Sequence, residues 1–441
     1  MVNDEIETIS YEQLNKIDIT PTNSLEFWKY QALKRATYVN LLKNGFQYKL
    51  RRELEDDAIE FFNYVHDNNL IFYDDYLESY LYSIAYKIYP IRLSDGRPGI
   101  LNIKILRDIN PNAFIFPNGS MFITTGLLSI INSEEELIGV MAHEISHFVL
   151  DHSIININKA IQRQKNAEFW AAFATIAAAA TEIYLASKYD YSNVGTLTYN
   201  TAVVSMAIAN TIAERMGQNF SREQEMEADE CAVELMKFLS INPLALSSAL
   251  EKIEDYLTLN GNYFALSEYG THPSLSRRIN TIGSPTVFND KNYDRKISFV
   301  NTYNSIVELD KQHFISSMNL AERNISAGVA TEEDYLLVAI ATMNMFDNEE
   351  KNTEALNLIN QAKSVNVLPS INILKQEAIV LIRLKKLFEA KICLQKYKDA
   401  LELEQSNNDK IIGTKQWESV NRYISKEYEW TVKMINKVDL L

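Results

Sequence analysis

The chain of 441 residues is poor in cysteine: Cys231 and Cys393 are the only two, far apart and within helical patterns. They supply neither a disulfide framework nor a cysteine-based metal site. Basic residues are also in the minority, with 43 Lys and Arg against 58 Asp and Glu and a net charge of −15. This balance, without a basic patch interleaved with aromatic residues, argues against nucleic acid as a partner.

A signal peptide is also missing, because the first five residues are acidic and polar. As written, the chain would stay in the cytoplasm; the alternative is a periplasmic or envelope protein whose signal was removed. Two charge-free segments, 169–181 and 191–213, fall short of the roughly 20 apolar residues of a spanning helix. We predict a buried or lid-like helical hairpin in an insertion at 160–215. A peripheral membrane contact through 169–213 is the alternative.

Histidine is scarce as well, with six in the whole chain, so the segment His143-Glu144-Ile145-Ser146-His147 is informative. It spells H-E-x-x-H inside a pattern that predicts a helix. His143 and His147 then share one face, so both imidazoles reach one metal ion while Glu144 handles a proton. This arrangement is typical of zinc peptidases.

The residues around the motif predict where its helix begins. Ser133 as N-cap and Glu136 three residues later form a capping-box pattern. The apolar residues that recur at helical spacing are Leu137, Ile138, Met141, Ile145, Phe148 and Val149. They leave the two histidines on a flank of the apolar face, where a cleft can form. The alternative is a helix whose histidines are merely hydrogen-bonded.

A catalytic zinc site needs a third protein ligand and one open position. The metzincin spacing is excluded, because Leu150 and Ser153 stand where that class has glycine and histidine. His152 is then either a surface residue or a residue that supports the ligands from behind. A glutamate at the thermolysin-like spacing is also missing, since Asn166 and Ala167 occupy those places.

A better candidate for the third ligand lies on a second helix, predicted to begin at Ser221 with Gln224 closing a capping box. Glu225 and Asp229 are one turn apart on it and share a face. Glu225 can ligate the metal while Asp229 orients a ligand from behind. Alone, the segment would be a charged, solvated helix start; beside H-E-x-x-H it predicts a metal ligand.

Four motifs in this order resemble the zinc peptidases that include HtpX, BepA and the CAAX prenyl endopeptidases. The resemblance covers roughly residues 60–285. Its motifs are the H-E-x-x-H helix, the segment 221–229 with its S-R-x-x-E-x-x-A-D pattern, Asn112-Ala113-Phe114 followed by Pro117-Asn118-Gly119, and Thr271 to Arg277 with H-P-x-x-x-R. In layout the chain is closest to BepA-like proteins, which join such a domain to a C-terminal helical repeat domain.

This resemblance implies one zinc ion per chain. Its ligands would be His143, His147 and Glu225, with Glu144 as the general base. Asp229 would lie behind the ligands. The roles of the downstream motif are less uniform within the family.

In that motif, the resemblance implies that His272 faces the metal or the oxyanion and that Arg277 supports the site. An imidazole donor next to zinc would stabilise the oxyanion of the tetrahedral intermediate. His272 could instead fill the open zinc position in a latent state. A His-Pro pair in an ordinary loop is the remaining alternative.

Residues 112–125 predict two short strands around Pro117-Asn118-Gly119, and residues 101–106 predict another strand. An edge strand beside the zinc would bind an extended peptide through backbone hydrogen bonds. We therefore assign Asn112, Ala113 and Phe114 to substrate binding. The alternative is an ordinary packed hairpin.

These elements predict an α+β fold. A helical region at 1–95 would pack on a zincin-like catalytic domain at 96–285, which combines a small, mostly antiparallel sheet with the active-site helices. A cluster of Gly, Pro, Asn and Asp near residues 283–292 marks a boundary. Beyond it, residues 296–441 predict an all-helical domain.

This helical domain contains a weak internal repeat. Ala355, Ile359 and Ala362 recur 35 residues later as Ala390, Leu394 and Tyr397, and Ala378 also fits the second copy. The period and the small residues are typical of degenerate tetratricopeptide repeats, whose concave surface binds proteins. A plain helical cap is the alternative.

The sequence therefore predicts a zinc-dependent metalloendopeptidase that cleaves extended or misfolded proteins, with a role in protein quality control that the resemblance alone implies. Protein or peptide substrates, and a protein partner on the repeat domain, are the expected partners. The rival hypothesis is a chaperone-like binding protein that uses its helical repeats and keeps a latent zinc site.

Overall fold

The structure is a computed structural model that describes residues 21–24, 26–28, 31, 54, 55, 58, 59, 61–89, 101–163, 220–259, 275–366, 370–408 and 415–440. The chain divides into two compact units, Met1–Lys296 and Ile297–Leu441. Most of the predicted insertion at 160–215, with both charge-free segments, lies outside the described residues. None of the described helices is long and apolar enough to cross a membrane.

Unit 1 contains a three-stranded sheet of β1 (Asn102–Leu106), β2 (Ala113–Ile115) and β3 (Ser120–Thr124), in the order β1-β3-β2. β2 and β3 form the predicted hairpin. Its turn is closed by the Gly119 N–H, which donates to the Phe116 carbonyl at 2.9 Å, and Gly119 has φ 85°. Glycine adopts this left-handed conformation without the steric penalty of a side chain.

β1 runs parallel to β3, so the sheet is mixed. The prediction of a mostly antiparallel sheet was therefore wrong. After β1, residues 107–112 lead to β2, which does not pair with β1. β2 forms the opposite edge of the sheet, next to β3. β3 then returns between the two strands in the direction of β1. Alternating hydrophobicity indicates strands but not the order in which they pair.

An aromatic cluster packs against the sheet. Phe114 and Phe116 meet Phe122 of β3 and Phe61 from the preceding helical segment. The ring of Phe61 lies edge-on to the other three at 4.8 to 5.8 Å between centroids. Such T-shaped contacts are favourable for aromatic pairs. The side chain of Phe114 is thus part of the core.

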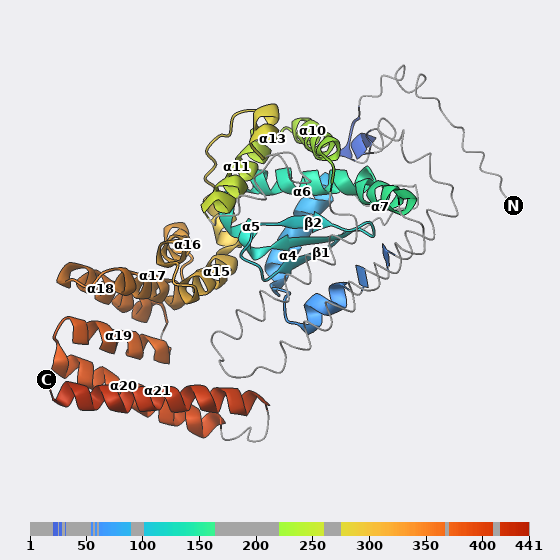
Figure 1. Ribbon diagram of the computed structural model, residues 1–441. Coiled ribbons are helices and arrows are strands. Elements are labelled where there is room, and N and C mark those ends of the chain that lie inside the picture. The colour runs from blue at the N-terminus through green and yellow to red at the C-terminus, as the bar shows by residue number, and fades with distance from the viewer. Residues whose placement is uncertain are drawn as a thin grey trace, which may run out of the picture. The chain divides into compact units, whose positions relative to one another are not determined.

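Helix α6 (Glu134–Val149) carries the H-E-x-x-H motif and lies in the middle of unit 1 (Figure 1). It packs on β2 on one side and on α10 (Arg222–Phe238) and α11 (Leu244–Leu259) on the other. Every residue of α6 from Glu136 to Val149 is buried. The motif therefore sits on a central helix rather than on a half-exposed amphipathic one.

The start of α6 is fixed by polar contacts. The Ser133 side chain accepts a hydrogen bond from the Glu136 backbone N–H at 3.2 Å, as predicted for an N-cap. The reciprocal bond of a capping box is displaced by one residue, because the Glu136 carboxylate accepts from the Asn132 N–H at 2.5 Å. The same buried carboxylate pairs with Lys252 of α11. At α10, both halves of the predicted Ser221–Gln224 capping box are present.

Small residues let these helices approach closely. A Cβ added at Gly139 would lie 3.1 Å from the Cα of Leu246, so α6 and α11 are nearly in backbone contact there. Ala228 of α10 is fully buried. The close approach brings the side chains of α10 next to the histidines of α6.

Shorter elements complete the described part of unit 1. They are α4 (Asp75–Ile88), α5 (Thr125–Ile130), α7 (His152–Arg163), α13 (Leu275–Ile282) and α14 (Lys291–Lys296). α4 packs on β1 and α6, and α13 packs on α10 and α11. From the N-terminal region, Trp28 donates its indole N–H to the Ile88 carbonyl, and Phe27 stacks on Phe238 of α10.

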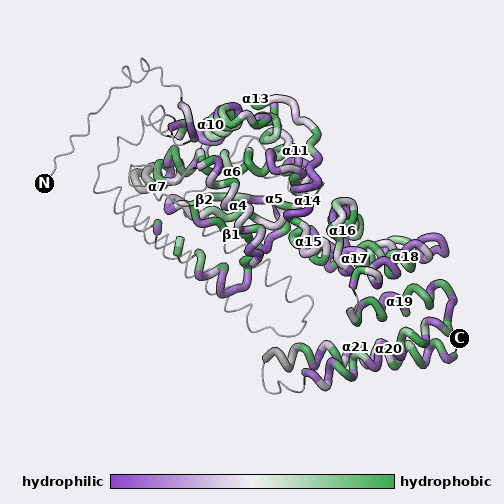
Figure 2. Tube along the Cα trace, turned by 180° about the vertical axis from the view of Figure 1, so that it is seen from behind, coloured by the Kyte–Doolittle hydropathy of each residue, from purple (hydrophilic) through white to green (hydrophobic). Residues whose placement is uncertain are grey.

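Unit 2 is helical in all its described elements. They are α15 (Ser298–Asp310), α16 (Phe314–Ala327), α17 (Glu332–Met345), α18 (Glu349–Val365), α19 (Ile371–Arg383), α20 (Leu387–Asn408) and α21 (Lys415–Asp439). Each packs on the next along the chain, and α15, α17 and α19 also contact one another in succession. Figure 2 shows hydrophilic and hydrophobic positions alternating along α20 and α21.

Gly126 provides a test of the fold. Its N–H donates to the Asp108 carbonyl, and an added Cβ would lie 2.1 Å from the carbonyl oxygen of Ile109. Gly126→Ala must therefore push β3 and α5 away from the loop, which we expect to lower the free energy of unfolding by about 3 kcal/mol. Urea unfolding followed by circular dichroism measures the change. Gly328→Ala meets no neighbour within 4 Å at φ 73° and should cost only about 1 kcal/mol; equal losses would contradict the steric argument.

Candidate metal centre

Three ligand-type side chains converge between α6 and α10. They are His143, His147 and Glu225, and their ligand atoms all lie within 4.8 Å of one another. The two Nε2 atoms are 3.1 Å apart. The carboxylate of Glu225 lies 3.5 Å from His143 Nε2 and 3.8 Å from His147 Nε2. All three side chains are buried.

This geometry fits a tetrahedral metal ion. Zn–N bonds of about 2.0–2.1 Å at the tetrahedral angle place two ligand nitrogens about 3.3 Å apart, close to the distance between these Nε2 atoms. Imidazole nitrogen and carboxylate oxygen are both common zinc ligands. Three protein ligands leave a fourth position for water or substrate, as in catalytic rather than structural sites.

Asp229 orients the first histidine. Its Oδ1 lies 2.8 Å from His143 Nδ1, on the side of the ring opposite Nε2. A carboxylate only accepts hydrogen bonds, so it favours a proton on Nδ1 and leaves the lone pair of Nε2 for a metal. The structure thus places Asp229 where the sequence expected a residue that supports a ligand from behind.

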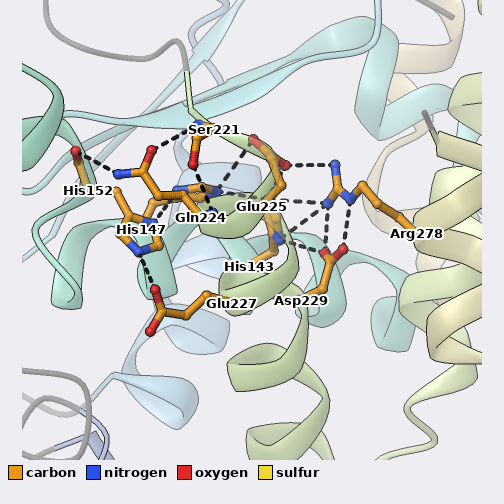
Figure 3. A network of polar contacts seen from close by, with 9 residues as sticks. All are labelled: His143, His147, His152, Ser221, Gln224, Glu225, Glu227, Asp229 and Arg278. Carbon is orange, nitrogen blue, oxygen red and sulfur yellow. Dashed lines mark hydrogen bonds and ion pairs between the residues drawn. The ribbon is translucent and has the colours of Figure 1, made fainter. Parts of the chain in front are cut away.

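Arg278, on α13, closes the network (Figure 3). Its Nε and Nη2 each donate to one oxygen of Asp229 at 2.7 Å, and its Nη1 lies 2.9 Å from Glu225 Oε2. Such a two-pronged guanidinium–carboxylate pair fixes both partners in one orientation. Its Nη2 also lies 3.3 Å from both ring nitrogens of His143.

The predicted Arg277 is exposed, whereas its neighbour Arg278 is buried and takes part in this network. A pair of adjacent arginines gives no local hint of which one faces inward, so the sequence did not single out Arg278. Arg278 faces inward together with its apolar neighbour Ile279, because these two residues form the buried face of α13. That apolar neighbour was the available signal.

The charges around His143 favour a cation. Burial and the nearby Arg278 lower the pKa of His143. The carboxylates of Asp229 and Glu225 raise it by more, so the resulting pKa is about 9. Burial alone would raise the pKa of Asp229, but Arg278 and His143 hold it below its usual value. The pocket therefore keeps Asp229 ionised and stabilises positive charge at His143.

Glu144 follows His143 on α6 and is buried. Burial raises its pKa; His143 lowers it and Glu225 raises it, and the result is about 7. A carboxylate with a pKa near neutrality can both accept and release a proton at physiological pH. This is the position at which the motif predicted a general base.

Behind His147 the structure reveals contacts that the sequence did not predict. His152 Nδ1 lies 2.9 Å from His147 Nδ1, and its Nε2 lies 3.2 Å from Glu227 Oε2. Phe220 stacks on the His147 ring, with centroids 3.7 Å apart and planes at 18°. His152 is buried, so of the two readings left open, a surface position is excluded.

Of the predicted substrate-binding residues, Ala113 and Phe114 lie on β2 and Asn112 directly precedes it. β2 is an edge strand of the sheet in the described chain and packs against α6. The Thr124 N–H donates to the Asn112 carbonyl and the Phe116 N–H to the Ser120 carbonyl. In an antiparallel ladder such hydrogen-bonded residues alternate with residues whose backbone groups face outward. The outward positions are therefore Ala113 and Ile115, whereas Asn112 and Phe114 face β3. The predicted His272 lies outside the described residues.

Two histidines one turn apart, joined by a carboxylate from a second helix, have the arrangement of a metallopeptidase metal site. Residues 96–286 match the model of peptidase family M48, so this part of the chain is an M48 peptidase domain. The match lies within unit 1, which ends at Lys296, and does not include unit 2.

Curated relatives carry related names. The chain is 29% identical over 180 residues to the mitochondrial metalloendopeptidase OMA1 of Schizosaccharomyces pombe, covering 41% of this chain and 45% of that protein. It is 28% identical over 189 residues to the metalloprotease YcaL of Escherichia coli, covering 42% and 61%. A putative beta-barrel assembly-enhancing protease of Vibrio cholerae is 28% identical over 151 residues, covering 34% and 28%. The chain thus spans less than two thirds of each of these relatives.

The two adjacent arginines give a matched pair of variants. Arg278→Gln leaves the buried carboxylates of Asp229 and Glu225 without their guanidinium, and breaking a buried ion pair in this way costs about 3–5 kcal/mol. Arg277→Gln changes an exposed residue and should stay within about 0.5 kcal/mol. Urea unfolding of the metal-free protein measures both. Equal effects of the two substitutions would remove Arg278 from its structural role.

Proposed function

We propose that the chain is a zinc-dependent endopeptidase that hydrolyses peptide bonds in extended or misfolded protein segments. The observation that carries this proposal is the convergence of His143, His147 and Glu225 beside Glu144 within an M48 peptidase domain. The names of the relatives, metalloendopeptidase and metalloprotease, support the same reaction.

The ligands would be His143, His147 and Glu225, and the ion one zinc per chain. Bound there, zinc supplies a Lewis acid and makes water acidic near neutral pH. Asp229 and Arg278 hold the ring of His143, and Glu225 is held by Arg278. Glu144 takes the proton from the attacking water and passes it to the leaving amine, a task that its pKa of about 7 suits.

Substrate would bind along the outer edge of β2. The outward backbone groups of Ala113 and Ile115 offer donors and acceptors to an extended peptide, beside the helix that carries the ligands. Backbone pairing gives affinity with little sequence preference, which suits a protease that acts on exposed, unfolded segments. His272 remains our candidate for the oxyanion donor or for a residue that closes the fourth metal position.

Unit 2 is proposed to be a degenerate tetratricopeptide-like array that binds a protein partner. α15 and α17 begin 34 residues apart, at Ser298 and Glu332, which is the length of one such repeat. The small and apolar residues of the sequence repeat are buried between the helices, among them Ala355, Ala378 and Ala390. The name of the Vibrio cholerae relative, a putative assembly-enhancing protease, supports a role in protein quality control.

Glu144→Gln is the direct test of the mechanism. The amide keeps the shape of the side chain but cannot accept a proton, so cleavage of an unfolded casein should fall at least about 100-fold while the zinc content stays near one per chain. Glu135→Gln, on the first turn of the same helix, is the control and should cleave normally. Full activity of Glu144→Gln would remove this residue from the mechanism. A wild-type protein that binds zinc and cleaves nothing would favour the chaperone-like alternative.

Glu225→Gln tests the third ligand. It keeps the volume of the side chain but loses the charge, so zinc affinity should fall more than about 100-fold, beyond the loss typical of residues that only support a ligand. Competition with a chromophoric chelator measures the affinity. Glu223→Gln, exposed on the same helix, is the control. Unchanged affinity in Glu225→Gln would mean that another residue completes the site.

A further inference from the structure

The second histidine of the motif is oriented differently from the first. The Nδ1 of His143 faces the carboxylate of Asp229. The Nδ1 of His147 instead faces another imidazole, with the Nδ1 of His152 at 2.9 Å. Both rings are buried, with 2% and 1% of their residue surface exposed. Two imidazole nitrogens at this distance share one hydrogen bond only if one donates and the other accepts.

Glu227 decides which one donates. Its Oε2 lies 3.2 Å from His152 Nε2, and a carboxylate only accepts. When the ring of His152 carries one proton, this contact places it on Nε2 and leaves a lone pair on Nδ1. That lone pair accepts from the Nδ1–H of His147, whose Nε2 is left with its own lone pair, 3.1 Å from His143 Nε2.

The opposite arrangement shows why this matters. If His152 had its proton on Nδ1, it would donate to His147, and the proton of His147 would move to Nε2. This proton would then point at the Nε2 of His143 and block the ligand atom. An imidazole behind a ligand, unlike a carboxylate, can act either way; a third group must fix its direction.

The surroundings hold this chain of contacts in place (Figure 3). Gln224 accepts the Ser221 N–H in the capping box of α10 and donates to the His152 carbonyl at 3.3 Å. The beginning of α7 is thereby tied to the beginning of α10, which carries Glu227. Phe220, directly before the N-cap residue Ser221 of α10, stacks on the ring of His147.

We propose that Glu227 and His152 form a positioning relay that fixes the proton of His147 on Nδ1 and keeps its Nε2 available to the metal ion. The relay rests on the proposed function, because His147 must be a ligand for it to act. The centre would then have one orienting arm per histidine: Asp229 behind His143, and Glu227 through His152 behind His147.

The test measures zinc affinity of the full chain by competition with a chromophoric chelator. Glu227→Ala should weaken zinc binding about 10- to 100-fold, the loss typical when support behind a ligand is removed. Glu230→Ala, an exposed glutamate on the same helix, should leave it unchanged. Circular dichroism and the thermal midpoint of the metal-free proteins check that the fold is retained.

A double substitution separates the relay from a simple charge effect. The amide oxygen of His152→Asn can accept from His147 Nδ1–H without Glu227, so this variant should bind zinc better than His152→Ala. In the His152→Asn background, Glu227→Ala should cost no further affinity. If it costs the same factor there, Glu227 acts only through its charge and the relay is wrong.

Two other outcomes would also overturn the relay. One is Glu227→Ala with the affinity of the wild type; the other is His152→Asn that binds no better than His152→Ala. Either of these leaves the zinc site and the proposed function standing. A wild-type protein that binds no zinc would overturn both, so the failure of the relay and the failure of the function are distinguishable.

Discussion

The pairing of Asp229 with Arg278 is the interaction on which the rest of the centre depends. Asp229, Glu225 and Glu144 lie in an interior from which water is largely excluded, where unpaired charge is costly. Arg278 pairs with two of these carboxylates, Asp229 and Glu225, and joins α13 to α10, while Asp229 joins α10 to His143 of α6. The same charged side chains that orient the ligand residues thus also hold three helices together. Stability and metal geometry therefore depend on one network.

Local signals in the sequence were sufficient for much of this arrangement. The N-cap at Ser133, the capping box at Ser221 and the turn at Gly119 each depend on residues three or fewer positions apart. The spacing of the H-E-x-x-H motif, and of Glu225 from Asp229, follows from the period of a helix. Such features can be read without knowing what packs against them.

Long-range choices could not be read in the same way. Which of two adjacent arginines faces inward depends on how α13 lies on α10, and the order of the strands depends on where residues 107–112 cross. The contact between His152 and Glu227 joins residues 75 positions apart. Neither residue belongs to a sequence motif that would predict this contact. His272 was predicted from a resemblance and lies outside the described residues.

The two units distribute their stability differently. In unit 1, the central helix α6 contacts the sheet and four further helices, α4, α7, α10 and α11, so a change in α6 affects the packing of all of them. In unit 2, the apolar contacts form several separate clusters between successive helices. Such stacks gain stability mainly from nearest neighbours.

The burial of α6 has a consequence for how the ion is exchanged. Ile145 and Ser146, the two variable positions of the motif, are fully buried, so packing of the helix helps to hold the histidines in place. In zinc fingers, by contrast, the metal supplies the free energy of folding. Here the domain would keep its shape while the ion leaves and returns.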